Sequence, residues 1–322
     1  MKQFLDIVAM KKLWFIVFVF PQFLLAQSLD FYRCASYGWG DGTAINFVSL
    51  ADGFVFRDHK DSLVIAEKYL GNNKIIDDNY HQLDSIHRHR FLSQAGIRET
   101  DKIFVFDFNL DTVFVFPVKN QEITAFITPY GTYKPIPQFD YMIGFDLTND
   151  FIKLNYTTAE YSTNLVYVGP GNPFVTGKVE KIKWKISNVS DFPNEKMSKS
   201  DREKSSRYQP IDCYSYSSGD YVYYLRNLTH NNIFVGRHLL VLKNNNDVKL
   251  SNFYFETEGS YLTPLNNVDQ FSGIEAFQYT GAIIRMKPRI VFGFLGQSFG
   301  CNKIDFISKD EPSIYIRCDN RH

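Results

Sequence analysis

Two apolar runs separated by a short polar turn constrain the fold of this chain more than any other feature of its sequence. Residues 102–108 read Lys-Ile-Phe-Val-Phe-Asp-Phe, residues 112–116 read Thr-Val-Phe-Val-Phe, and three residues separate them. Nearly continuous aromatic and β-branched runs of this length are typical of strands buried on both faces. They predict an antiparallel hairpin in a β-rich core, and Asp107 is expected to bond to the turn rather than act as a catalytic acid.

Comparable runs recur along the chain, separated by turns rich in Asn, Gly or Pro, and the 30 Phe and 20 Tyr residues suit sheets. We therefore predict a mainly β fold of antiparallel sheets, sandwich-like, in one or two bodies, with one or two short helices. Residues 178–186 alternate between apolar and lysine side chains and predict a single strand with one wet face. Paired aromatic strands at 103–116 and 233–255 leave a degenerate β-propeller as the alternative, although no fixed repeat accompanies them.

One helix is predicted near residues 79–95. Asp78 or Asn79 can cap its start, Gly96 can end it, and apolar side chains recur between them at helical spacing.

The same segment contains three of the seven histidines, His81, His87 and His89. On a helix His87 and His89 point in different directions, whereas on a strand they would share one side. Because the helical pattern is the stronger one, no metal or other cofactor is predicted, and a histidine metal site is kept as the alternative.

The chain is expected to begin with a cleaved signal peptide over residues 1–26. Lys11 and Lys12 precede an apolar run that ends in the small residue Ala26, which is the order of regions in a secretory signal. The run is shorter than the roughly 20 residues that a membrane-spanning helix needs. No cysteine follows Ala26 directly, so a lipid anchor at the cleavage point is not expected. The predicted location is secreted or periplasmic, without a transmembrane span after cleavage.

The remaining chain is divided on composition. Residues 194–207 are almost entirely polar and predict an exposed loop or linker. It would separate a β-rich domain at 27–193 from a β-rich C-terminal domain at 208–322. The alternative is one continuous domain over 27–322.

Four cysteines remain after the signal, and an even number in an exported chain indicates disulfides. Of the three connectivities, we predict Cys301 with Cys318 and Cys34 with Cys213. Direct opposition of Cys301 and Cys318 would place the apolar side chains of the two flanking strands on opposite faces. A bulge near residues 300–302 would restore agreement. Otherwise these two cysteines do not pair.

Several classes of function lack support. Lys plus Arg equals Asp plus Glu at 35 each, so no net charge attracts nucleic acid. No Gly-x-Ser-x-Gly or His-Glu-x-x-His motif is present, and no cysteine spacing fits a zinc site. A glycosidase needs only two suitably spaced carboxylates, so the sequence does not decide against one.

Tyrosines crowd residues 208–224, and the predicted ligand-binding candidates are Tyr214, Tyr216, Tyr221 and Tyr223. If their rings are exposed at strand spacing, they can stack on sugar rings, beside carboxylates such as Asp212 and Asp220. Cross-strand packing is the alternative use of the same rings. The sequence favours an exported, disulfide-stapled, non-catalytic binding or cell-envelope-associated protein. Its ligand is not identified by the sequence, and a glycan or an envelope protein is a candidate partner. A carbohydrate-active enzyme or sugar-binding module is the alternative.

Overall fold

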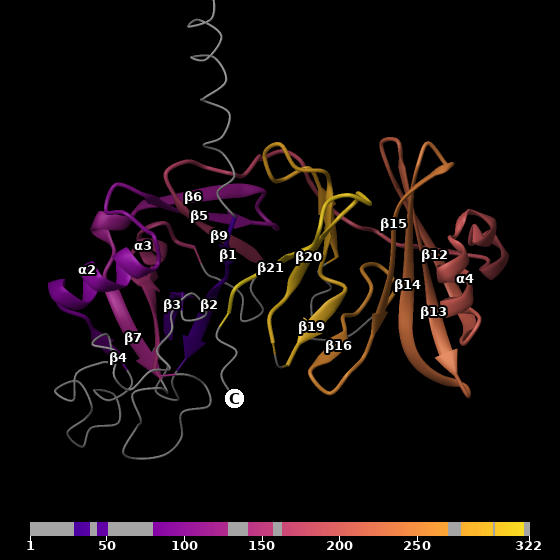
Figure 1. Cartoon of the computed structure of the whole chain (residues 1–322), viewed down its shortest axis with the longest axis horizontal. Coiled ribbons are helices and arrows are strands. Elements are labelled where there is room, and N and C mark those ends of the chain that lie inside the picture. Colours follow the sequence, from indigo (N-terminus) through magenta and orange to yellow (C-terminus); the bar gives the residue numbers. More distant parts are fainter. Residues whose placement is uncertain are drawn as a thin grey trace, which may run out of the picture. The chain divides into compact units, whose positions relative to one another are not determined.

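A computed structural model describes residues 29–38, 44–50, 80–127, 141–156, 163–269, 278–298 and 300–318. The predicted signal peptide at 1–26 and the cap residues Asp78 and Asn79 lie outside these ranges. Residues 31–322 form one compact unit. Its strands assemble into several antiparallel sheets with short helices, in a sandwich-like arrangement (Figure 1). The predicted fold class is confirmed.

The first sheet contains the predicted hairpin. In spatial order its strands are β1 (Phe31–Tyr32), β9 (Asn164–Gly169), β5 (Lys102–Asp107) and β6 (Thr112–Pro117). All of β5 after Lys102 is buried, which explains its apolar sequence. The Asp107 carboxylate accepts 2.8 Å hydrogen bonds from the backbone N–H groups of Asn109 and Leu110. The expectation that Asp107 bonds to the turn is confirmed.

The second sheet shares a hydrophobic core with the first. In spatial order its strands are β2 (Cys34–Gly38), β3 (Ala44–Ser49), β8 (Tyr141–Asp146), β7 (Ile123–Ile127) and β4 (Tyr80–Gln82). Val105 from β5 packs in one cluster with Val48 from β3 and Phe145 from β8. The helix α3 (Thr148–Lys153) and the short 3-10 helix η4 (Val118–Asn120) contribute Phe151 and Val118 to the same cluster.

The predicted helix is shorter than expected. The helix α2 spans Ser85–Gln94, whereas the preceding residues form β4, in which Tyr80 pairs with Phe126 of β7. Sheet pairing takes these residues out of the helix. Asp84 then provides the cap, accepting 3.1 Å hydrogen bonds from the N–H groups of Ile86 and His87. Gly96, with φ of +66°, follows the helix end as predicted.

The third sheet consists of long hairpins in sequence order. Its strands are β11 (Lys185–Ser187), β12 (Gln209–Ser218), β13 (Tyr221–His230), β14 (Ile233–Lys243) and β15 (Asp247–Phe255). The segment at 194–207 contains the 3-10 helix η7 (Asn194–Lys196) and the helix α4 (Lys199–Ser205), after the 3-10 helix η6 (Val189–Asp191). Figure 1 shows α4 lying along one face of this sheet. The division of the chain at 194–207 stays a prediction.

The remaining strands form a fourth sheet and a two-stranded ribbon. The fourth sheet has the order β10 (Val179–Lys181), β17 (Tyr279–Gly281), β18 (Ile290–Phe292), β20 (Lys303–Phe306) and β21 (Ile314–Tyr315), and the ribbon pairs β16 (Ser260–Leu262) with β19 (Leu295–Gln297). The predicted single strand at 178–186 is therefore wrong, because β10 and β11 belong to different sheets. Ile182 and Trp184 between them are buried, whereas Ile186 is 81% exposed.

Aromatic contacts join the first and fourth sheets. The ring of Phe108 stacks on that of Phe292 with centroids 5.1 Å apart and lies 5.1 Å from that of Tyr279. Phe174 packs against Phe31 and Phe106. Among the described residues, the sheets differ in strand order and do not repeat as propeller blades would.

Candidate functional site

The four candidate tyrosines do not form an exposed platform. Tyr214 and Tyr223 are 6% and 0% exposed and belong to the hydrophobic core under the third sheet, while Tyr216 and Tyr221 are half-buried against it. These four rings lie on or beside the face of β12 and β13 that packs on the fourth sheet and the ribbon. The packing alternative therefore describes them, since a buried ring has no free face for a sugar.

The sequence did not reveal an ion pair between Glu180 and Arg289. Tyr216, Tyr221 and Tyr223 all contact it. The carboxylate of Glu180 on β10 accepts 2.8 Å hydrogen bonds from the hydroxyls of Tyr216 and Ser218, and Arg289 contacts it at 3.0 Å. The guanidinium of Arg289 lies over the ring of Tyr221, 5.3 Å from its centroid. This cluster links β10 to β12 and to the start of β18.

The charges in this cluster are balanced internally. Burial opposes ionisation of Glu180, but hydrogen bonds from Ser218, Tyr216 and Arg289 outweigh it and hold the pKa of the carboxyl below its ordinary value. Burial, together with the neighbouring Glu180, raises the pKa of Tyr216. Both Glu180 oxygens already accept hydrogen bonds from the protein, so we interpret the cluster as a connection between sheets.

The two carboxylates named beside the tyrosines lie apart. Asp212 accepts a 3.1 Å hydrogen bond from the Asn227 amide, and Asp220 pairs with Lys243 at 3.3 Å. Asp212 lies near the start of β12 and Asp220 follows its end. At about 3.4 Å per residue the strand separates them by more than about 20 Å. A glycosidase pair needs roughly 5 to 10 Å.

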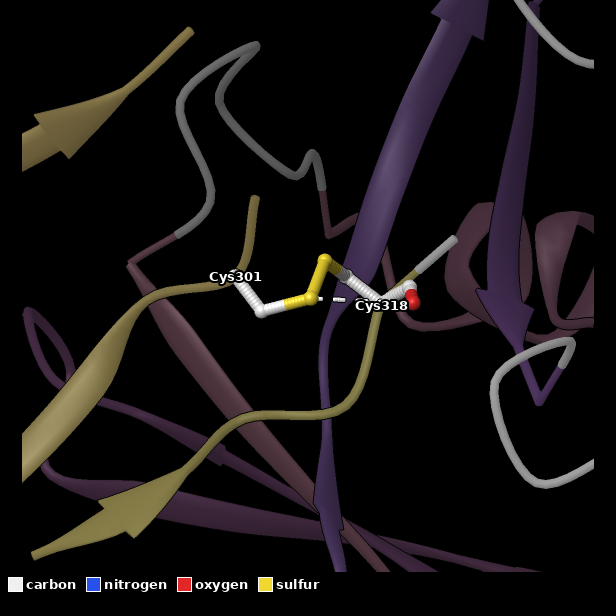
Figure 2. Close-up of a disulfide and its surroundings, with 2 residues drawn as sticks. All are labelled: Cys301 and Cys318. Atoms are coloured by element: carbon white, nitrogen blue, oxygen red, sulfur yellow. Dashed lines mark hydrogen bonds between the residues drawn. A yellow bond between two sulfur atoms is a disulfide. The ribbon is translucent and has the colours of Figure 1, made fainter. Parts of the chain in front are cut away.

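The predicted disulfide between Cys301 and Cys318 is present (Figure 2). The register conflict is resolved by a shift of one residue: Ile304 lies opposite Ile314, so Cys301 is bonded to the residue beyond its direct partner. The same register continues to Asn302, whose carbonyl accepts a 2.8 Å hydrogen bond from the Ile316 N–H, so no bulge separates β20 and β21 there. The Arg317 N–H donates to the Phe31 carbonyl of β1 at 2.7 Å, which draws the end of the chain away from β20.

The predicted disulfide between Cys34 and Cys213 is wrong. Both cysteines are free, buried thiols. Cys34 lies in the core shared by the first two sheets. Cys213 packs with Phe192 and Met197 on the other face of the third sheet from the four tyrosines. Burial raises the pKa of the Cys213 thiol and, more strongly, that of Cys34.

The three histidines of the predicted helix are not gathered. His81 lies on β4, with its Nε2 3.4 Å from the Tyr141 hydroxyl, and His87 Nδ1 contacts Asp84 at 2.8 Å. His89 is exposed on α2. Within the part of the chain that the structure describes, no three His, Cys, Asp or Glu side chains converge as metal ligands.

A second polar cluster beneath the third sheet was also missed by sequence reasoning. Arg226 is 3% exposed, and its guanidinium donates to Asn194 at 2.8 Å and to Ser205 at 2.6 Å. It also contacts His238 Nδ1 at 3.1 Å, and His238 Nε2 lies 3.0 Å from the Ser251 hydroxyl. Burial lowers the pKa of Arg226 to about 10 and, with help from Arg226, that of His238 to about 3. The sequence signal for this cluster was a polar residue within each of two apolar strands, and these two residues, Arg226 and His238, lie opposite each other.

A polar groove runs beside the outer strand β15. It has a volume of about 600 Å³ and is lined by residues 246–252 of β15 and the preceding turn. Lys196, Ser198 and Asp201 line it from the segment around the start of α4, and Ser308 and Lys309 line it from the loop after β20. Amines, carboxylates, amides and hydroxyls therefore face one open hollow, which suits a polar ligand.

The fold and this groove define a β-rich protein with a disulfide-fastened C-terminal strand and a polar surface site. Comparisons of the chain with protein-family models, curated proteins and solved structures found no match. Over the described residues, no helix is long and apolar enough to cross a membrane.

Proposed function

We propose that this chain is an exported, non-catalytic binding protein that holds a polar ligand in the groove beside β15. Export is supported by the signal-like pattern of residues 1–26 and by the disulfide between Cys301 and Cys318, since disulfides persist in oxidising compartments. The groove is the observation that carries the binding proposal, because charged and polar side chains from three segments line one open hollow of about 600 Å³.

Other polar clusters support the groove by contrast. Glu180, Arg226 and His238 each use their polar atoms on neighbouring protein groups. In the groove, Lys309 is exposed and has no ion-pair partner among the described residues. The other groove residues are partly paired with one another: Lys196 donates to Asn246 at 2.9 Å, and Asp247 pairs with Lys249 at 2.5 Å. A ligand would meet the exposed Lys309 first.

Export is tested by producing the full chain in a bacterium and separating the cellular compartments. The expected product begins at Gln27, lies outside the cytoplasm, and yields a disulfide-linked peptide containing Cys301 and Cys318 in mass spectrometry. An uncleaved chain recovered in the cytoplasm would contradict export.

Binding is tested by screening the purified protein against glycan and peptide arrays. Lys196→Glu combined with Lys309→Glu reverses two charges in the groove and should abolish any hit. The matched control combines Lys181→Glu with Lys183→Glu, two exposed lysines outside the groove, and should bind like the wild type. Equal loss in both variants, or no hit on any array, would contradict the groove as the binding site.

A further inference from the structure

The outer edge of β15 exposes backbone hydrogen-bonding groups. β15 is the last strand of its sheet and pairs only with β14. The Glu256 N–H donates to the Val235 carbonyl, which sets the alternation of the antiparallel ladder. Residues 250, 252 and 254 therefore face β14. The N–H and C=O groups of Ser251, Phe253 and Phe255 point outward and bond to no other described residue.

The hairpin between β13 and β14 gives the same alternation independently. Its two-residue turn, Asn231–Asn232, has positive φ at both positions, so His230 and Ile233 form a hydrogen-bonded pair. Val235 is the extra residue of a bulge in β14, so the alternation continues from there with the backbone groups of Arg237 and Leu239 pointing toward β15.

Two walls flank this edge from opposite faces of the sheet. One wall is the segment that contains Lys196 and Ser198, and Met197 between them packs with Leu240 on one face of the sheet. The other wall is the loop that contains Ser308 and Lys309, and the preceding Ile307 packs with Leu239 on the opposite face. A groove of about 600 Å³ whose floor is a strand edge matches a single extended chain better than a second folded sheet.

A bulge marks where the regular edge begins. Leu242 pairs with Val248 and Val241 with Leu250, so Lys249 is the extra residue. From Leu250 to Phe255 the ladder is regular, which is the length of an ordinary short strand. A lysine and a bulge both protect a strand edge from pairing, so the segment around Lys249 is closed to an added strand and only the edge from Leu250 onward is open to one.

The charges in the groove favour an acidic partner. Lys196, Lys249 and Lys309 line it together with Asp201 and Asp247. Asp247 already pairs with Lys249 at 2.5 Å, and Asp201 accepts a 2.7 Å hydrogen bond from the Ser198 hydroxyl. The Lys196 amine donates a 2.9 Å hydrogen bond to the Asn246 side chain, and the charge of Lys309 acts on Asp247. Three lysines against two aspartates leave the groove lining with a net positive charge, which suits an added strand with acidic side chains.

We propose that the edge of β15 receives an extended acidic segment of a partner polypeptide as an additional strand of the third sheet. This inference rests on the proposed function, because it uses the same groove. Within the groove, backbone hydrogen bonds to Ser251 hold the segment, which continues along the edge to Phe253 beyond the groove lining. The lysines select its acidic side chains.

The test measures binding of a fluorescent heptapeptide, Thr-Glu-Val-Glu-Val-Glu-Thr, to the full chain by anisotropy. Ser251→Pro removes an outward N–H without breaking the ladder to β14, and Ser251→Ala is the matched control that loses only the hydroxyl. We expect Ser251→Pro to bind about tenfold more weakly than Ser251→Ala, because both variants lose the hydroxyl and only the proline variant also loses the N–H. Melting curves verify that both variants are folded.

Two peptide controls need no protein variant. A heptapeptide with Lys in place of Glu should bind at least tenfold more weakly. Two further heptapeptides carry N-methyl groups on alternate backbone amides, one on the odd and one on the even residues, and only the one whose methylated amides face β15 should lose binding. These controls keep the test decisive even if Ser251→Pro fails to fold.

The outcomes separate the inference from the proposed function. Peptide binding that is unchanged by N-methylation and by Ser251→Pro overturns strand addition but leaves the groove as a binding site. Glycan binding at the groove without peptide binding does the same. Self-association that Ser251→Pro abolishes identifies a second copy as the occupant and overturns the acidic peptide. No ligand at the groove in any assay overturns both proposals.

Discussion

Acid should destabilise this protein through His238. The imidazole is 0% exposed, stacks on the ring of Phe253 with centroids 3.9 Å apart, and lies between Arg226 and Ser251. Burial, followed by the charges of Arg226 and Lys204, lowers its pKa from 6.5 to about 3. The ring is therefore neutral in the folded protein, where its Nδ1 accepts from the guanidinium.

The direction of the pH effect follows from proton uptake. Between pH 6.5 and 3 the unfolded chain protonates this histidine and the folded protein does not, so the free energy of unfolding falls as the pH falls. Above pH 6.5 the contribution is constant. Each pH unit well inside the window corresponds to about 1.4 kcal/mol. Because the unfolded histidine is already half protonated at pH 6.5, lowering the pH from 6.5 to 4.5 removes roughly 2 kcal/mol.

The assay compares urea unfolding of the wild type with that of His238→Gln at pH 7.5, 6.5, 5.5 and 4.5. Glutamine keeps an acceptor and a donor but cannot titrate. At pH 7.5 the variant should be less stable by about 1 to 3 kcal/mol, because it loses the stacking and the ring's hydrogen-bond geometry. The difference should shrink by about 1.4 kcal/mol per pH unit below 6.5, while shared carboxyl effects cancel. A difference that stays constant over this range would refute the reasoning.

Three further predictions concern the cysteines and one glycine. Replacing both Cys301 and Cys318 with Ala opens a loop with a sequence separation of 17, which should cost about 3 kcal/mol and lower Tm by about 5 °C; a melting curve that does not move would contradict this role. Thiol titration of the mature protein should find no reactive thiol when folded and two in denaturant, from Cys34 and Cys213; zero in denaturant would restore the second disulfide. Gly144→Ala would place its Cβ 1.9 Å from a carbonyl oxygen of β3, so we expect a loss of at least about 3 kcal/mol in urea unfolding; wild-type stability would contradict the packing.

Local sequence patterns were enough to predict the elements whose environment is uniform. The first arm of the hairpin at 102–116, β5, is apolar on both faces because both faces are buried, as its sequence predicts. The second arm, β6, was expected to be equally buried, but it is an edge strand, and Val115 is 46% exposed. The Cys301–Cys318 disulfide was predictable from flanking strand patterns. The register argument excluded direct opposition of the two cysteines, but the structure avoids the conflict by an offset of one residue and not by the predicted bulge.

The tertiary structure decided every feature that depends on which elements become neighbours. The alternating residues 178–186 looked like one strand, but two sheets compete for its ends and divide it into β10 and β11. Strand spacing alone favoured cross-strand packing of the tyrosines but also allowed an exposed platform. In the folded protein Tyr214 and Tyr223 belong to the core, and Tyr216 and Tyr221 are partly buried against it.

The same limit applies to the candidate binding site. Nothing in the sequence of β15 distinguishes an edge strand from a central one, because edge position depends on which strands pair. The groove exists because Lys196 and Lys309, 113 positions apart in the sequence, reach the same strand from opposite faces of the sheet. The periodicity of apolar residues indicates which side chains of an element are buried. A site depends on contacts between residues far apart in the chain, and a single sequence carries little information about those contacts.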